Sequence, residues 1–325
     1  MPADVDENRS AGLGLGLALL SAGAFGTSGT FARSLLDVGW TPGAAVLLRV
    51  TIAATALTLV VAPQLRRHRG ELRRRGRVLA VYGVAAVAGA QLCYFNAVEH
   101  LSVAVALLLE YSGILLVVVW MWARHGHRPR LLTVGGAAAS IAGLALVLDV
   151  FGDVTISGAG VAWGLGAAVG LATYFVISAE SSDDALPPLI TAWGGLVIGG
   201  VALGVAALVG ALPVTIVRSD VVLADRSVSW LVPLLGMSLL AAAFSYVAGV
   251  AGARLLGAKV ASFVGLTEVL FAVVFAWVVV DESMSTGQLV GGVLVVVGIV
   301  LVKLDETDDG GGLPSGSPAT TLVSD

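Results

Sequence analysis

Two glutamates, Glu110 and Glu268, stand inside long apolar stretches, AVALLLEYSGILLVVV from Ala104 and SFVGLTEVLFAVVFAW from Ser262. A carboxylate at membrane depth costs roughly 2.5–3.5 kcal/mol on insertion scales, so it requires a partner or a function. Such a group can bind the cationic part of a substrate, or take up a proton in exchange for it. Because the two glutamates occupy matching places, they predict one shared site in a small-molecule transporter. The alternative is that each only holds neighbouring helices together.

Three further residues are candidates for the same substrate- or proton-binding site. Arg49 lies about 9 Å inside an apolar segment, where it could pair with a glutamate or a substrate carboxylate, or else extend to the membrane surface. Tyr94 and Tyr246 occupy similar sequences, LCYFNA and FSYVAG, and could line a polar cavity or pack between helices. The segment GTSGT at 26–30 could likewise unwind to expose backbone groups, or pack tightly.

The composition indicates the environment that must hold these residues. Of 325 residues, 57% are hydrophobic and 12% are charged, whereas soluble domains carry about 25% charged residues. The single cysteine, Cys93, excludes an internal disulfide framework and a multi-cysteine metal site. The one dense basic run is short and lies between apolar spans, so nothing supports nucleic-acid binding. We expect a lipid bilayer as the partner, and neither a metal nor a cofactor.

Polar breaks divide the chain into apolar spans, most of them close to the roughly 20 residues needed to cross a bilayer. The fold class predicted is an all-α integral membrane protein with about ten transmembrane helices. The expected spans are 11–32, 43–62, 78–98, 101–122, 132–149, 158–179, 189–210, 230–252, 260–280 and 286–304.

Arginines predict the orientation. Seven lie between the second and third spans, at 66–77, and three more lie between the fourth and fifth, at 124–130. Such loops are cytoplasmic. With ten spans, both termini then lie in the cytoplasm of a multi-pass plasma-membrane protein. The first ten residues carry three acids and one arginine, the wrong sign for a cleaved signal peptide.

An internal repeat is indicated by glycines placed seven residues apart in the helix that follows each glutamate stretch: Gly136 and Gly143, then Gly291 and Gly298. Five spans per copy would force the second copy upside down, giving an inverted repeat. The predicted divisions are an N-terminal cytoplasmic tail (1–10), a first five-helix repeat (11–149), a connecting loop (150–157), a second repeat (158–304) and a disordered cytoplasmic tail (305–325).

Inversion sets the depth of the two carboxylates. Glu110 lies about nine residues from the outer end of its span and Glu268 about eight from the inner end of its own. At 1.5 Å per residue both are about 12–14 Å deep, close to the middle of a ~30 Å hydrocarbon core. The two side chains are therefore expected at the same level.

This plan resembles the EamA family of the drug/metabolite transporter superfamily. The most specific match is LTEVLFAVVFAWVVVDESMSTGQLVGGVLVVVGIVLV at 266–302, with a glutamate before an apolar helix, a short turn at Asp281-Glu282 and a glycine-bearing last helix. Arg49 matches an arginine common in the family's second helix. The likeness covers about residues 12–303 and implies export or exchange of a small metabolite without ATP.

Two details refine the likeness. The stretch VAVALLLEYSGILLVVV also resembles the amino-acid exporter branch that includes threonine and homoserine exporters. The chain departs from the family at Gly113-Ile114, where many members have a proline soon after the glutamate, and it likewise lacks one after Glu268. The resemblance therefore gives no reason to expect a proline kink in either helix.

Rival functions find less support. The sequence GTSG at 26–29 matches the GxSG of rhomboid proteases, but the histidines lie at loops or span ends, where none could activate a serine. No GxxxxGK[ST] motif is present for an ATP-driven pump. The chain is thus expected to be no enzyme. It is expected to be an alternating-access carrier for an amino acid or drug-like compound, with protons as a candidate coupling ion; a channel or a membrane scaffold is the alternative, and the oligomeric state is left open.

Overall fold

The computed structural model describes residues 2–310 except for 102, 127–128, 151–156, 183–184, 225 and 281–284. Within these residues, eight helical segments are long and apolar enough to cross a membrane, and Leu131–Val147 is a shorter apolar helix. The strands described are β1 (Val221–Leu223) and β2 (Arg226–Val228), an antiparallel hairpin. The protein is an all-α membrane protein, as predicted.

The first half of the chain supplies the segments that end with α8. They are α1 (Pro2–Leu36), α2 (Pro42–Leu65), α3 (Arg69–Arg74), α4 (Gly76–Val81), the π-helix η1 (Tyr82–Gly89), α5 (Ala90–Val98), α6 (Val103–Tyr111), α7 (Gly113–His125) and α8 (Leu131–Val147). The second half follows as α9 (Gly158–Ser178), α10 (Pro188–Leu208), the hairpin, α11 (Leu231–Leu235), the π-helix η2 (Gly236–Phe244), α12 (Ser245–Gly265), α13 (Thr267–Val280) and α14 (Thr286–Gly310).

Both terminal helices are longer than the sequence predicts. Helix α1 begins at Pro2, and α14 continues past 304 to Gly310. The extension of α14 has a physical reason, because Asp305 is buried, lies 3.5 Å from the ammonium group of Lys259 and accepts a hydrogen bond from Thr133. The rest of the predicted C-terminal tail, and most of the predicted connecting loop, lie outside the described residues.

A glycine divides α12. Gly257 has φ 77° and ψ 161°, a conformation that residues with a Cβ rarely adopt. The helix therefore breaks there, and residues 258–265 lead into α13 rather than prolonging the eighth span. The predicted spans 230–252 and 260–280 correspond to the segments on either side of this break.

The two halves carry matching irregularities. A π-helix precedes Tyr94 in the first half, and another precedes Tyr246 in the second. π-Helices are rare in proteins, and those that do occur are often found at functional sites. The helix interruptions near the glutamates do not match: one follows Glu110, at Ser112, and the other precedes Glu268, at Leu266, and neither involves a proline.

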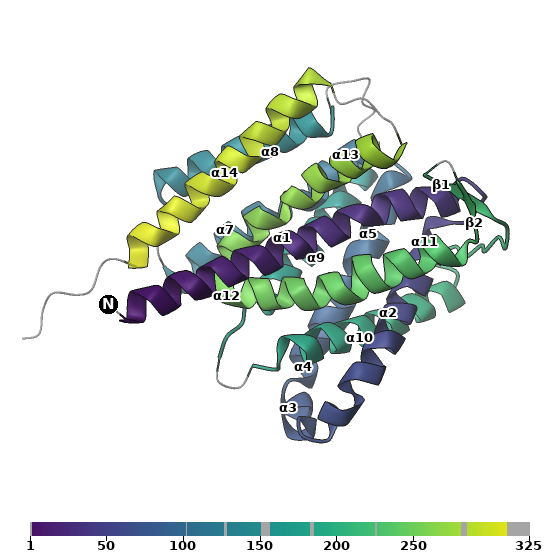
Figure 1. Ribbon diagram of the computed structural model, residues 1–325, viewed down its shortest axis with the longest axis horizontal. Coiled ribbons are helices and arrows are strands. Elements are labelled where there is room, and N and C mark those ends of the chain that lie inside the picture. Colours follow the sequence, from purple (N-terminus) through teal and green to yellow (C-terminus); the bar gives the residue numbers. More distant parts are fainter. Residues whose placement is uncertain are drawn as a thin grey trace, which may run out of the picture.

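Helices α8 and α14 pack along each other at one edge of the molecule (Figure 1). A Cβ built on Gly143 would lie 2.6 Å from the carbonyl oxygen of Gly291, and one on Gly136 would lie 2.7 Å from that of Gly298. The reverse contacts are equally close, so side chains at these glycines would force the helices apart. The glycines singled out in the sequence therefore meet each other across the two halves.

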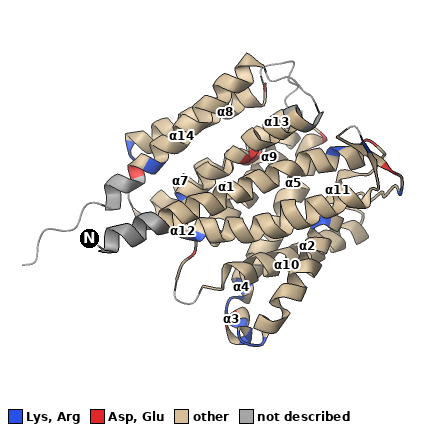
Figure 2. Cartoon of the chain, viewed as in Figure 1, with Lys and Arg blue, Asp and Glu red and all other residues tan. Residues whose placement is uncertain are grey.

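Charge and apolar surface are separated along the helices. Figure 2 shows Lys and Arg gathered around α3 and near helix ends, while the middles of the helices are largely uncharged. Large aliphatic side chains face outward, among them Leu59, Leu131 and Leu208 at 78%, 90% and 88% exposure. This distribution suits a lipid environment.

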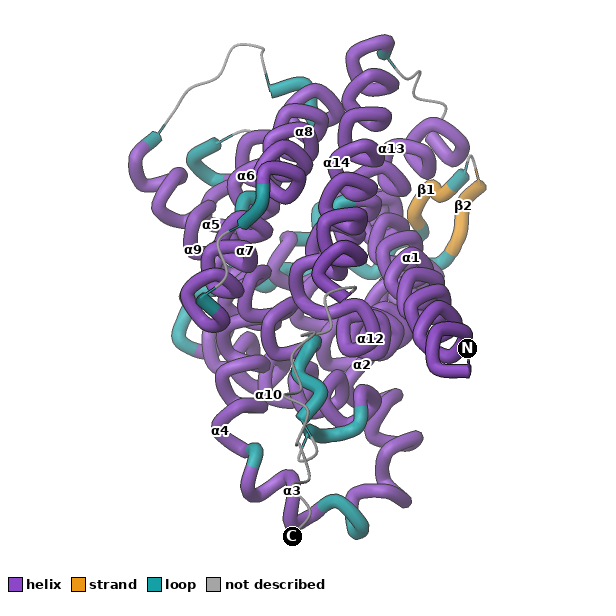
Figure 3. The backbone as a smooth tube through the Cα atoms, turned by 90° about the vertical axis from the view of Figure 1, so that its left-hand side faces the viewer, coloured by secondary structure: helices purple, strands orange, loops and turns teal. Residues whose placement is uncertain are grey.

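Two ends of the bundle can be named from their contacts. The arginine-rich end contains the segment 66–75, the start of α4 and the end of α9. The hairpin end contains β1 and β2, which lie beside the end of α1 (Figure 3). There Trp40 packs against Trp230 at 5.7 Å between ring centroids and donates to the Val217 carbonyl at 2.6 Å.

Candidate functional site

Both glutamates lie in the interior of the helix bundle. Glu110 is near the end of α6 and Glu268 near the start of α13, so they come from opposite halves of the chain. Each is half-buried, and the two carboxyl groups are close enough to interact electrostatically. The structure therefore brings together the pair that the sequence analysis singled out.

Glu268 has polar neighbours from the first half. The Tyr111 hydroxyl donates a hydrogen bond to its carboxylate, and Arg49 lies within electrostatic range. Helix α1 approaches closely at Gly26, where a built Cβ would lie 3.0 Å from the Glu268 carbonyl oxygen. A small residue at this position is required for that contact.

Arg49 is buried, with 9% of its surface exposed, and does not extend to the membrane surface. Its Nη1 donates to Ser28 Oγ at 2.9 Å and its Nη2 to the Ala241 carbonyl at 3.1 Å. The guanidinium carbon lies 5.8 Å from the centroid of the Phe25 ring, in a cation–π arrangement. Its Nε has no hydrogen-bond partner among the described residues.

The GTSGT segment of α1 remains helical, so the possibility of unwinding is not realised in this structure. Thr27 donates to the Ala24 carbonyl at 2.6 Å, and Ser28 accepts from Arg49. This segment packs and positions the arginine.

Aromatic rings form one wall beside the charged groups. Tyr246 packs edge-on against Phe25 at 5.3 Å and against Tyr174 at 5.7 Å between ring centroids. It also lies within electrostatic range of Arg49 and of both glutamates. Tyr246 therefore belongs to the same cluster.

Glu110 has a different environment. Tyr94 and Cys93 lie within its electrostatic range, and Tyr94 is half-buried. Among the described residues, no hydrogen bond or ion pair to the Glu110 carboxyl is present. All five predicted residues thus lie in one region, but Arg49, the basic residue among them, lies within electrostatic range of Glu268.

Sequence reasoning missed Tyr111 and Tyr174. Tyr111 directly follows Glu110, and this position could have indicated that it belongs to the site. Its partner, Glu268 on α13, could not be identified without the fold. The Tyr174 hydroxyl is hydrogen-bonded to the Ser21 side chain. The Ser21 hydroxyl in turn donates to the Ser245 carbonyl at 2.8 Å. Within the part of the chain that the structure describes, no cluster of metal-ligating side chains occurs.

The groups gathered here offer chemistry for a substrate that carries both charges. A carboxylate can hold an ammonium group, and a guanidinium can hold a carboxylate through charge-assisted hydrogen bonds. Aromatic rings beside them can pack on the apolar parts of a ligand or on a cation. The arrangement therefore suits a small polar molecule better than a purely apolar one.

Known proteins match nearly the whole chain. The model of the EamA-like transporter family matches residues 12–149 and 158–304. An uncharacterized transporter of Archaeoglobus fulgidus is 26% identical over 283 residues, covering 87% of this chain and 93% of that protein. A solved crystal structure has a similar fold, with a TM-score of 0.71 at 18% identity, covering 91% of this chain and 98% of that one. The chain belongs to the EamA-like transporter family and is a multi-pass membrane transporter.

Proposed function

We propose that the protein exports or exchanges a small metabolite, an amino acid or a drug-like compound, by alternating access. The observation that carries this proposal is the meeting of Glu110 and Glu268, from opposite halves, beside the buried Arg49. Charged groups inside a membrane bundle mark substrate and ion pathways.

Substrate binding is assigned to the Glu268 side of the cluster. An ammonium group would lie at the Glu268 carboxylate and a carboxylate group at Arg49, whose Nε has no partner among the described residues. Tyr246 would pack on the apolar part of the substrate. A zwitterion satisfies both charges at once, which favours amino acids among small metabolites.

Proton coupling is assigned to Glu110. Its carboxyl has no cationic partner in the described residues, so neutralisation by a proton compensates its burial. Tyr94 stands beside it. Proton release on one side of the membrane would then be linked to substrate movement.

Alternating access is attributed to two inverted repeats, residues 11–149 and 158–304. The matching π-helices and the reciprocal glycine contacts support this division. Rocking of one repeat against the other about a fixed central site is the usual consequence of such symmetry.

The arginine-rich end is assigned to the cytoplasm of the plasma membrane, together with both termini. The seven arginines at 66–77 support this orientation. Cysteines introduced singly into this segment and into the β-hairpin would test it, since an impermeant thiol reagent added to intact cells should label only the hairpin.

Purified protein in proteoliposomes tests the function. Uptake of a pool of radiolabelled amino acids, driven by a pH gradient, should be saturable, and Glu110→Gln or Glu268→Gln should abolish it without affecting membrane insertion. Glu99→Gln, which changes an exposed acid directly after α5, is the matched control. Unsaturable flux would indicate a channel, and normal uptake by both variants would contradict the site.

A further inference from the structure

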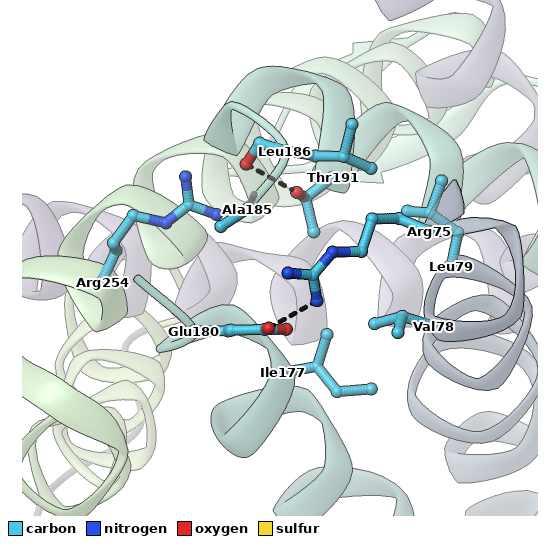
Figure 4. A pocket seen from close by; sticks show the side chains of 9 residues that line it. All are labelled: Arg75, Val78, Leu79, Ile177, Glu180, Ala185, Leu186, Thr191 and Arg254. Atoms are coloured by element: carbon cyan, nitrogen blue, oxygen red, sulfur yellow. Dashed lines mark hydrogen bonds and ion pairs between the residues drawn. The ribbon is translucent and has the colours of Figure 1, made fainter. Parts of the chain in front are cut away.

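A small pocket lies at the arginine-rich end, away from the two glutamates. Its apolar lining includes Val78, Leu79 and Ile177, and three charged side chains line it as well: Arg75, Glu180 and Arg254 (Figure 4). The charged residues come from α12 and from the chain next to α4 and α9.

One ion pair closes this region across the two halves. Arg75 Nη1 lies 2.5 Å from Glu180 Oε1, and Arg75 Nη2 donates to Ser182 Oγ at 2.8 Å. Ser182 in turn donates to Glu180 at 3.2 Å. Arg75 precedes α4 and Glu180 follows α9, so the contact ties a first-half helix to a second-half helix.

A second arginine stands on the other side of the pocket. Arg254 of α12 lies within electrostatic range of Glu180, and its Nε is buried without a hydrogen-bond partner among the described residues. Glu180 therefore has one bonded cation and a second cation nearby.

We propose that Glu180 is a gate residue. It forms an ion pair with Arg75 in the closed arrangement and with Arg254 when the arginine-rich end opens. This inference rests on the alternating access proposed above. In this proposal, the ion pair between Arg75 and Glu180 closes one side of the central site.

The exposure of the pair suits a contact that must break in every cycle. The Arg75 and Glu180 side chains are 22% and 36% exposed. Ion pairs this accessible to water are weak, and their loss shifts an equilibrium by about two- to fivefold. The gate would therefore bias closure without locking it.

Thiol labelling of the purified protein measures the opening directly. Leu79 lines the pocket and is 5% exposed, so a Leu79→Cys thiol should react with a bulky maleimide only when this end opens. Adding Glu180→Gln should raise its labelling rate about two- to fivefold. Peptide mass spectrometry separates this thiol from the native Cys93.

Two comparisons make the test decisive. Glu71→Gln, which removes an acid paired with His68 in the adjacent segment, should leave the rate unchanged. The charge exchange Arg75→Glu with Glu180→Arg should restore slow labelling that each single change accelerates. An unchanged rate in Glu180→Gln, or fast labelling in the exchanged pair, would overturn the gate.

Failure of the gate is distinguishable from failure of the proposed function. Labelling requires no substrate, whereas uptake in proteoliposomes does. Normal uptake with an unchanged labelling rate would remove only the gate.

Discussion

Glu110 and Glu268 occupy matching stretches but have different surroundings. Glu268 accepts a hydrogen bond from Tyr111 and has Arg49 nearby, whereas no such partner is described for Glu110. The two glutamates, which stand in similar sequences, therefore have different chemical partners. We infer separate roles, substrate binding for Glu268 and proton transfer for Glu110.

The origin of the difference is visible in the second helix of each half. Helix α2 carries Arg49, whereas the corresponding helix α10, PLITAWGGLVIGGVALGVAAL, has no charged residue. The single arginine of α2 lies beside the glutamate of the second half. One half thus completes the site of the other.

The largest effect is expected for Glu268→Gln. The change removes the proposed charge-assisted contact to the substrate, and truncating one partner of a buried charge pair costs about 2–5 kcal/mol of binding free energy, or roughly 30-fold or more in affinity. Both gradient-driven uptake and substrate counterflow should be lost. Retained counterflow would contradict the binding role.

Arg49→Gln should weaken transport about 10- to 100-fold, because a hydrogen bond to a charged group contributes about 1.5–3 kcal/mol. Arg49→Lys keeps the charge but cannot bond both Ser28 and Ala241 with the same geometry. Its activity should lie between those of wild type and Arg49→Gln. Concentration dependence of counterflow measures both.

Glu110→Gln should separate the two roles. Gradient-driven uptake should be lost, while counterflow at equal pH on both sides should continue within a few-fold of wild type. Uptake that still responds to the pH gradient would show that the proton is carried elsewhere.

Tyr111→Phe should have the smallest effect, about three- to tenfold on the substrate concentration needed for half-maximal counterflow, since one hydrogen bond is lost and the ring remains. Tyr82→Phe removes the bond to Ser178 and serves as the control for losing a buried hydroxyl. Equal effects of the two variants would argue against a specific role for Tyr111.

Much of the fold followed from apolar spans and glycine spacing. The sequence showed the repeated glycine spacing in the two halves. It did not show that Gly143 and Gly291 contact each other. The break at Gly257 and the two π-helices were missed, because both are local backbone choices imposed by packing.

For the site, the glutamates and Arg49 could be found because charge is rare in apolar sequence. Their partners could not, since Tyr111 and Glu268 are distant in sequence and meet only in the folded chain. The Arg75–Glu180 pair was hidden for the same reason, being 105 residues apart.

The most direct test of the shared site is a parallel assay of wild type, Glu110→Gln and Glu268→Gln in proteoliposomes, with pH-gradient-driven uptake and counterflow of the same amino-acid pool. We predict that Glu268→Gln loses both activities and that Glu110→Gln loses only the first. Wild-type rates for both variants in both assays would contradict the account.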